Sequence, residues 1–301
     1  MGTVAEIKQA LGRFAEEAAG SSPLYGHLAE HAAADDEVAA LLTAAPEGNA
    51  HPALLLAVAH RLIEADPIHP LSRYYPTLGG LDGADAETWP MFRAFLLERA
   101  DAARELIATR FIQTNEPHRA ALLYPAVALA ATQARGPLAL LEVGCSAGLL
   151  LGLDRFGYRY QCDGGEQYTA GPVKAPVGLH CAVAVAAGAT FVKPPKKLVV
   201  GARIGLDRAP VDAGDEEELA WLEACVWADQ PERVRLLRAA AAAQRKNPPE
   251  LVRGDAVNDL AATAARLPAD LPLVVFTSNT MPHLPPERRP AFLEALGDNS
   301  A

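Results

Sequence analysis

The first third of the chain repeats an apolar pattern that is typical of amphipathic helices. Apolar residues recur at three- and four-residue spacing between Thr3 and about Ala108, and turn-rich links such as APEGNAHP and YYPTLGGLDGAD separate the repeats. We therefore expect residues 1–112 to form a helical N-terminal cap. The helical segments are VAEIKQALGRF, PLYGHLAEHA, DDEVAALLTAA, ALLLAVAHRLI and WPMFRAFLLERADAARELIA.

From about residue 113 onward, apolar runs that read as strands alternate with helical patterns. The strand-like runs are LALLEV, KLVVGARIGLD, ELVRGDA and PLVVFTSN, and each is followed or preceded by an amphipathic segment. This alternation predicts an α/β domain over residues 113–301, built on a Rossmann-like doubly wound parallel sheet. Residues at about 155–197 are rich in Gly, Pro, Tyr, Val and Thr, and we read them as an insert of short strands and turns.

A loop of small residues follows the first predicted strand. Leu138–Asp154 reads LALLEVGCSAGLLLGLD, so that Glu142 stands near the strand end and Gly144, Ser146 and Gly148 follow it. In a doubly wound sheet, ligands bind beyond the carboxyl ends of the strands. The loop matches neither the dinucleotide fingerprint, because it lacks the second glycine, nor a Gly-Lys-Ser/Thr phosphate loop. Since a carboxylate repels phosphates, Glu142 favours a cationic, adenosine-type ligand such as S-adenosylmethionine.

Two later strands of the predicted sheet also end in acids, at Asp207 and at Asp255. An acid at the end of the second strand can hold both ribose hydroxyls, and one at the end of the third can accept from an adenine amino group. Asp163 is an alternative ribose acid, because it follows Gly144 at nearly the ~20-residue spacing of dinucleotide folds. We favour Asp207, which ends an apolar run, whereas Asp163 stands in the turn-rich insert.

Each of these features also has a purely structural explanation. The glycines can permit a tight strand-to-helix turn, and each acid can cap a helix N-terminus. Helix capping explains Asn115 and Glu116 equally well, and His283, flanked by prolines, fits an ordinary loop histidine. The occurrence of three acids at strand ends around one glycine loop favours a ligand site.

Composition and charge narrow the class of partner. The formal net charge is −10 and no Lys/Arg block offsets it, which disfavours nucleic acid. No apolar run approaches the ~18 residues of a membrane helix, and the mixed-charge N-terminus is unlike a signal peptide. We expect a cytoplasmic protein that acts on a small molecule and does not bind a membrane.

Cysteine and histidine spacing predicts neither a disulfide framework nor a metal site. The four cysteines form no C-x-x-C pair, and the eight histidines form no H-E-x-x-H or similar ligand pattern.

Several longer motifs carry a resemblance to a known family. They are TNEPHR (114–119), LLEVGCSAGLLLGLDRF (140–156), RIGLDRAPVD (203–212), WLEACVWADQPER (221–233) and LVRGDA (251–256). From about Leu24 to its end the chain resembles the uncharacterised bacterial domain-of-unknown-function family 2332. The resemblance implies a relation in sequence to S-adenosylmethionine-dependent methyltransferases.

The resemblance implies a role for individual residues. The cofactor-binding residues it implies are Glu142, Gly144, Ser146, Gly148, Asp207, Asp255, Ala256 and Ser278. Candidate catalytic residues are His283 and Glu116, and candidate substrate-binding residues are Asn115, Arg119 and Asn279. Ser146 stands where methyltransferases usually have glycine.

The resemblance also implies that the C-terminal strands of a methyltransferase sheet are missing. The apolar strand Leu273–Thr277 would then lie at a sheet edge, where unpaired backbone groups invite association. The N-terminal helices, the insert or a second subunit in a homodimer must cover it; we favour the first or the last.

Two functions of different classes follow. The leading hypothesis is an S-adenosylmethionine-dependent methyltransferase that acts on a small molecule. The alternative is a non-catalytic ligand-binding or assembly protein that keeps the methyltransferase-like fold.

Overall fold

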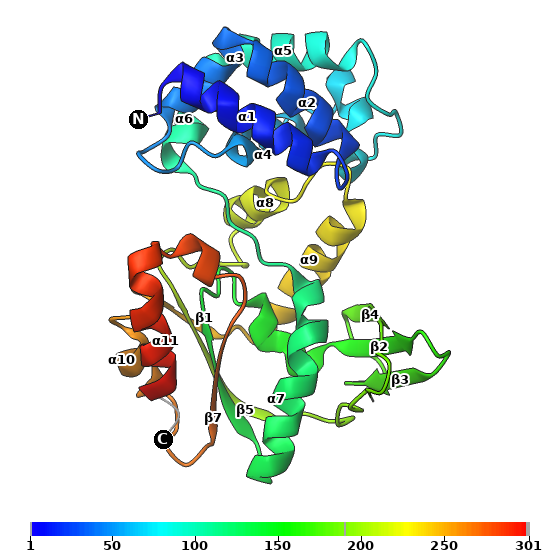
Figure 1. Cartoon of the computed structure of the whole chain (residues 1–301), viewed down its shortest axis with the longest axis vertical. Coiled ribbons are helices and arrows are strands. Elements are labelled where there is room, and N and C mark those ends of the chain that lie inside the picture. The colour runs from blue at the N-terminus through cyan, green and yellow to red at the C-terminus, as the bar shows by residue number, and fades with distance from the viewer. Residues whose placement is uncertain (1, 190, 299–301) are drawn as a thin grey trace. The chain divides into compact units, whose positions relative to one another are not determined.

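The computed structural model describes residues 2–189 and 191–298 (Figure 1). The chain divides into two compact units, one made of Met1–Thr114 with Glu216–Arg235 and the other of Asn115–Asp215 with Leu236–Ala301. In the part of the chain that is described, no helix is both long enough and apolar enough to cross a membrane.

The first unit is helical, as its apolar periodicity predicts. The last predicted segment is broken into two helices at Arg99, whose guanidinium pairs with Asp66 at 2.7 Å and lies 4.1 Å from the centre of the Phe95 ring. The helices of Met1–Thr114 are α1 (Val4–Ala18), α2 (Pro23–Ala34), α3 (Asp36–Leu41), α4 (Pro52–Glu64), α5 (Thr88–Glu98) and α6 (Ala100–Thr109), with 3-10 helices η1 (Leu42–Ala44), η2 (Pro70–Tyr74) and η3 (Pro76–Leu78).

Side-chain caps define where several of these helices begin. Thr3 and Glu6 form a reciprocal capping box at the start of α1. The Ser22 hydroxyl accepts from the Tyr25 amide before α2, and the Asp35 carboxylate accepts from two amides at the start of α3.

The segment Glu216–Arg235 belongs to the core of the first unit, although the sequence boundary at residue 113 assigned it to the second domain. It contains α8 (Glu216–Ala224), from which Trp221 is buried in the helical core. Arg61 and Arg110 of the N-terminal helical region pair with Glu217 and Glu218 at 2.7 and 2.6 Å. The next helix, α9 (Pro231–Gln244), begins in the first unit and ends in the second.

The second unit contains a parallel sheet of four strands in the order β6-β5-β1-β7. The chain runs from β1 to β5 and β6 on one side and then returns to place β7 on the other side of β1. The order of strands therefore reverses between β1 and β7. The strands are β1 (Leu138–Val143), β5 (Val200–Asp207), β6 (Glu250–Arg253) and β7 (Leu273–Thr277).

The two faces of this sheet are covered by different helices. On one face, Leu141, Val143, Ile204 and Leu206 pack against α10 (Leu260–Ala264) and α11 (Arg289–Asp298). Figure 1 shows α7 (Ala120–Ala134) on the other side of the sheet. Because side chains alternate along a strand, this second face carries Glu142 and Asp207.

The insert forms a separate three-stranded sheet in the order β3-β2-β4, from β2 (Gly157–Cys162), β3 (Gln167–Ala170) and β4 (Gly178–Val183). Between the glycine loop and this sheet the chain forms a 3-10 helix, η5 (Leu149–Arg155), and not the α-helix expected there. Arg203 accounts for part of this difference, because its guanidinium donates to the Leu151 carbonyl at 2.7 Å. In an α-helix this carbonyl would accept from a backbone amide four residues later. The remaining 3-10 helices are η4 (Pro117–Arg119), η6 (Met281–His283) and η7 (Pro286–Arg288).

Candidate functional site

The candidate site lies in the second unit, at the carboxyl ends of β1, β5 and β7. This is the edge at which a parallel sheet binds ligands, at the point where the strand order reverses. The structure brings Glu142, the glycine loop, Asp207 and the segment after β7 together here. Asp163 is not part of this group, since it follows β2 in the separate three-stranded sheet and accepts from the Val185 amide.

The glycine loop turns sharply through backbone conformations with positive φ. Gly144, Ser146 and Gly148 have φ of 74°, 51° and 67°. Glycine adopts this region freely, whereas serine does so at a cost in conformational energy. The Asp207 carboxylate accounts for the conformation at Ser146, because its Oδ2 accepts from the Ser146 amide at 2.8 Å.

Most backbone amides of the loop donate to acceptors inside the protein. This arrangement leaves few of them for a phosphate or a ligand carboxylate, and it matches the structural explanation of the loop. The amides of Gly144 and Cys145 donate to the Leu206 carbonyl at 2.8 and 3.4 Å, and the Ser146 amide donates to Asp207 at 2.8 Å. The Gly148 amide donates to the Cys145 carbonyl at 2.7 Å, and the Leu149 amide donates to Asn115 Oδ1 at 2.9 Å.

Other parts of the protein fill the space beside the loop glycines. A Cβ on Gly144 would lie 2.0 Å from the Thr280 hydroxyl oxygen, and one on Gly148 would lie 2.8 Å from a Leu251 methyl carbon. The glycines therefore allow Thr280, in the segment after β7, and Leu251, in β6, to approach the loop that follows β1. A bound ligand at Gly144, which the resemblance implies is a cofactor-binding residue, is therefore not needed to explain the glycine at this position.

Glu142 is the unusual group of the site. Its side chain is 1% exposed, and within the described residues its Oε2 atom has no hydrogen-bond partner. Burial raises the pKa of this carboxyl well above its ordinary value, the negative charge of Asp207 raises it further, and the positive charge of Arg119 lowers it. A buried carboxylate oxygen without a donor is costly, so a cationic donor placed beside it would be strongly favoured.

Asp207 is half-buried and is held rigidly by the backbone. Its Oδ2 accepts from Ser146 and its Oδ1 accepts from the Ala209 amide, both at 2.8 Å. Each carboxylate oxygen has two lone pairs, so both can accept a second hydrogen bond. Asp207 can thus support the loop and still bind a ligand hydroxyl.

The segment before α7 secures the glycine loop. Asn115 is buried and bridges the loop, since its Nδ2 donates to the Cys145 carbonyl at 3.2 Å while its Oδ1 accepts from Leu149. Glu116 caps η4, and its Oε1 lies 2.9 Å from His118 Nδ1. Arg119 approaches the Ser278 carbonyl at 3.5 Å. The expected substrate residue Asn115 is therefore a clamp on the loop, and Arg119 is the cation that acts on Glu142.

Asp255 is occupied by a partner within the protein. Arg288 binds its two oxygens at 2.7 Å each, and the amides of Val257 and Asn258 donate to its Oδ1 at 3.0 Å. The pair with Arg288 is the main cause of a pKa held well below the usual range. Ala256 packs against the face covered by α10 and α11.

The segment after β7 contributes Ser278, Asn279 and His283. Asn279 is exposed and has a φ of 68°, a conformation that asparagine tolerates better than most residues. His283 is exposed at the end of η6. Ser278 is partly buried, and its carbonyl faces Arg119. These residues lie at the same edge of the sheet as Glu142.

Three residues that the motifs did not single out shape the site. Thr280 donates to the Val143 carbonyl at 3.0 Å and fills the space beside Gly144. Gln244 donates to the Ala147 carbonyl at 2.5 Å, and Gly205 leaves room for the Cys145 sulfur. Of these three, only Gly205 could have been noticed in the sequence, because a glycine within an apolar strand indicates that another group lies close to the backbone.

The distribution of His, Cys, Asp and Glu side chains bears on metal binding. Across residues 2–189 and 191–298, no group of three or more His, Cys, Asp and Glu side chains is placed to hold an ion.

Comparison with known proteins defines the family. No curated protein and no solved structure matches the chain. A family model described as an uncharacterized protein conserved in bacteria matches residues 8–301, which is nearly the whole chain. The chain therefore belongs to the domain-of-unknown-function family 2332.

Proposed function

We propose that this protein is an S-adenosylmethionine-dependent methyltransferase that acts on a small molecule, with a Rossmann-like domain as its cofactor-binding unit. Counted along the chain, the sheet order β6-β5-β1-β7 is third, second, first, fourth, which is the order of the first four strands of that fold. The order supports the proposed fold class but does not by itself imply an activity.

The observation that carries the proposal is the unpaired oxygen of Glu142. It is buried at the point where the strand order reverses, next to a second acid, Asp207. A ligand with a positively charged amino group would supply the missing donor and offset the two negative charges. S-adenosylmethionine carries such a group, and a phosphate ligand does not.

The two other acids predicted to bind the cofactor, Asp207 and Asp255, differ in whether they are free to accept a hydrogen bond from it. Asp207 keeps lone pairs for ribose hydroxyls, and its position is fixed by Ser146 and Ala209. Asp255 would have to release Arg288 before it accepted from an adenine amino group. The fit is therefore good at Glu142 and Asp207 and incomplete at Asp255.

The chain's own residues would bind and align the reactants. The cofactor supplies a methyl group on a sulfonium centre, and the protein contributes mainly by alignment of the acceptor with it. Where the acceptor carries a proton, a base must remove it. Among the candidates, Glu116 already bonds to His118, so the exposed His283 is the better placed to take a proton from solvent-facing substrate.

Calorimetry of wild type and Glu142→Gln tests the cofactor site. S-adenosylmethionine and S-adenosylhomocysteine both carry the positively charged α-amino group of their amino-acid part, whereas adenosine lacks that group and keeps only the neutral amino group of adenine. Loss of a charged hydrogen bond should weaken both amino ligands roughly ten- to hundred-fold and leave adenosine unchanged. Asp163→Asn is the matched control, because it alters an acid in the other sheet.

Two results would contradict the proposal. One is an absence of detectable binding of S-adenosylmethionine by wild type at millimolar concentration. The other is equal binding by wild type and by a Glu142→Gln variant whose circular dichroism shows that it is folded.

The alternative of a non-catalytic binding protein is favoured by the pairing of Asp255 with Arg288. Incubation of the protein with S-adenosylmethionine and a mixture of bacterial small metabolites separates the two functions. Formation of S-adenosylhomocysteine above a protein-free control supports transfer. Binding without any such product favours the alternative.

A further inference from the structure

The insert of the second unit is basic, although the chain as a whole is acidic. Residues 155–197 contain six Lys and Arg residues and two Asp and Glu residues, a formal charge of +4, whereas the whole chain carries −10. Four of the six lysines of the chain lie in this insert; they are Lys174, Lys193, Lys196 and Lys197. All four are exposed, and no carboxylate of the described residues lies within ion-pair distance of any of them. Their charges are therefore open to an anionic partner.

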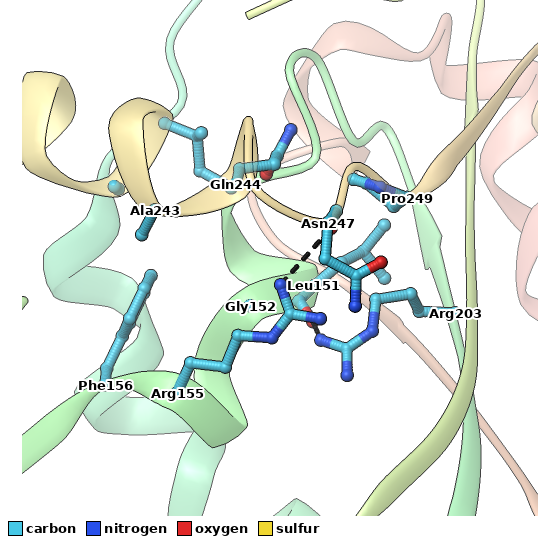
Figure 2. Close-up of a pocket in the computed structure, with 11 residues that line it drawn as sticks. Leu151, Gly152, Arg155, Phe156, Arg203, Ala243, Gln244, Asn247 and Pro249 are labelled. Atoms are coloured by element: carbon cyan, nitrogen blue, oxygen red, sulfur yellow. Dashed lines mark hydrogen bonds between the residues drawn. The ribbon is translucent and has the colours of Figure 1, made fainter. Parts of the chain in front are cut away.

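Two arginines near the start of the insert differ from these lysines, because the protein itself uses their donors. Figure 2 shows Arg155 and Arg203 around a small hollow of about 10 Å³, which is room for about one water molecule. Arg203 binds both carboxylate oxygens of Asp154, at 2.9 and 3.2 Å. Arg155 donates to the Asn247 carbonyl at 3.2 Å, the bond drawn as a dashed line in Figure 2. The positive charge that the insert offers to a partner is therefore that of the lysines.

Two segments of the insert place the lysines beside β3. The turn between β3 and β4 carries one of them, and residues 191–197 carry the other three. The Gly171 amide, at the start of the turn, donates to the Lys196 carbonyl at 3.0 Å. Lys193 Nζ lies 4.7 Å from the centre of the Tyr168 ring, which belongs to β3. Because β3 is an edge strand of the three-stranded sheet, the two segments meet at this edge of the insert (Figure 1).

Each of these segments also exposes an apolar side chain next to a lysine. Val173 precedes Lys174 and is 103% exposed, which is the exposure of an extended chain. Val192 precedes Lys193 and is 68% exposed. Exposed lysines and exposed valines thus alternate at one edge of the insert. We call this set the insert surface; it consists of Val173, Lys174, Val192, Lys193, Lys196 and Lys197.

We propose that the insert surface binds a lipid bilayer that contains anionic lipids. The lysines would lie among the negatively charged headgroups, which attract clusters of basic residues. Val173 and Val192 would enter the boundary between headgroups and acyl chains, where apolar side chains leave water. The flexible apolar stem of lysine allows its ammonium group to stay with the headgroups while the valines lie deeper.

The chemistry of the insert surface favours a lipid headgroup layer over nucleic acid. Nucleic acid is commonly bound by arginines, whose planar fork pairs with a phosphate, and by aromatic rings that stack on bases. The cations of the insert surface are all lysines, and the nearby rings of Tyr168 and Phe191 pack on each other with 5.4 Å between their centres. A phosphate backbone offers nothing to an exposed valine, whereas the acyl boundary does.

The proposed contact needs no segment that spans the membrane. The expectation from the sequence that the protein does not bind a membrane rested on the lack of such a segment, and a contact at the surface is compatible with that lack. Nor does the contact depend on the proposed methyltransferase function. Failure of either proposal therefore leaves the other standing.

Sedimentation of the full chain with lipid vesicles tests the proposal. We expect binding to vesicles of equal parts phosphatidylcholine and phosphatidylglycerol, weakened by added salt, and no binding to phosphatidylcholine alone. A variant with both Lys193→Gln and Lys196→Gln should bind the mixed vesicles roughly ten- to thirty-fold more weakly. The matched control carries Lys8→Gln and Lys246→Gln, the same change of net charge at the two lysines outside the insert, and should bind as wild type does.

A third variant, Val173→Ser, separates insertion from attraction between charges. It leaves the charge unchanged and removes the apolar side chain, so binding to the mixed vesicles should weaken about five-fold. All of these positions except that of Lys8 are exposed, and circular dichroism of each variant checks that it is folded.

Four results would overturn the proposal. One is a lack of binding to the mixed vesicles at low ionic strength, which would leave an acidic protein as the partner. Another is equal weakening in the two double variants, because the charge of the whole molecule and not the insert would then be responsible. A third is unchanged binding by Val173→Ser, which would show that no side chain enters the bilayer. The last is tighter binding of a DNA duplex than of the vesicles, lost in the Lys193 and Lys196 variant, which would assign the insert surface to nucleic acid.

Discussion

Glu142 and Asp207 end neighbouring strands on one face of the sheet, yet their surroundings are opposite. Asp207 receives two backbone amides, whereas Glu142 is buried with an unpaired oxygen. A carboxyl group therefore stabilises the loop at Asp207, whereas at Glu142 a carboxyl group without a hydrogen-bond donor destabilises the fold. The strained carboxyl is the one that a ligand would relieve.

The raised pKa of Glu142 predicts a pH-dependent effect of Glu142→Gln on stability. The folded state holds the proton more tightly than the unfolded state, in which the pKa is near 4.5. The stability contributed by the protonated acid is present below that pH and is lost as pH rises through the folded pKa. Because glutamine resembles the protonated acid, the variant should match wild type at pH 4 and exceed it at pH 8.

Urea unfolding of both proteins at the two pH values, without ligand, measures this effect. A difference in free energy of unfolding that does not change with pH would show that Glu142 does not titrate differently in the folded state. A ligand with a positively charged amino group should narrow or reverse this difference at pH 8, since it binds the ionised wild type more tightly than the variant and so stabilises it more.

At the scale of elements, a pair of side chains joins the turn after β6 to the start of α11. Arg288 ends η7, which leads directly into α11, and it binds both oxygens of Asp255. The same carboxylate accepts from the amides of Val257 and Asn258. Asp255 is thus a cap and an ion-pair partner at once.

Arg288→Gln separates these two contributions. It removes the ion pair and keeps the capping bonds, so we expect a loss of up to about 1 kcal/mol at pH 7, as is typical of a half-exposed pair. Asp255 has a depressed pKa in the folded state, so the pair contributes above the unfolded pKa of 3.8 and its contribution is lost as pH falls. The difference in free energy of unfolding between Arg288→Gln and wild type should therefore disappear at acidic pH, below the folded pKa of Asp255.

Arg289→Gln provides the control for this measurement. The Arg289 guanidinium donates to the Leu284 carbonyl, which does not titrate. Its effect on urea unfolding should stay constant with pH. An equal pH dependence in the two variants would refute the role of Asp255.

At the scale of the whole molecule, β7 stands at the edge of the four-stranded sheet. It pairs with β1 on one side, and no strand of the described chain pairs with its other side. Parallel strands direct alternate amides to opposite sides, so half of the β7 amides face away from β1. An edge of this kind is a site where another chain can add.

We predict that a second copy of the chain covers this edge in a homodimer. Hydrogen exchange of Val274–Phe276, measured with the mass in solution, tests it. Protection of consecutive amides that weakens as the protein is diluted to a monomer supports the dimer. Alternating fast and slow exchange at every concentration shows an uncovered edge, and full protection in a monomer shows that the chain covers itself.

The sequence by itself determined the elements of this protein. Three- and four-residue periodicity located the helices of the first unit, and apolar runs located all four strands of the parallel sheet. These signals are local, because burial of one face of a helix or strand dictates the spacing of apolar residues. The positions of Glu142, Asp207 and Asp255 at or just beyond strand ends followed from the same patterns.

Only the tertiary structure decided which groups those residues contact. It placed Asp207 rather than Asp163 beside the loop, through a bond between residues 61 positions apart. It gave Asp255 a partner 33 positions away and put Thr280, which bonds to a residue 137 positions away, beside Gly144. No local pattern encodes such pairs, because they depend on which strands become neighbours. The unpaired oxygen of Glu142 is likewise a property of the assembled sheet, since a lack of partners is defined only once every neighbour is in place.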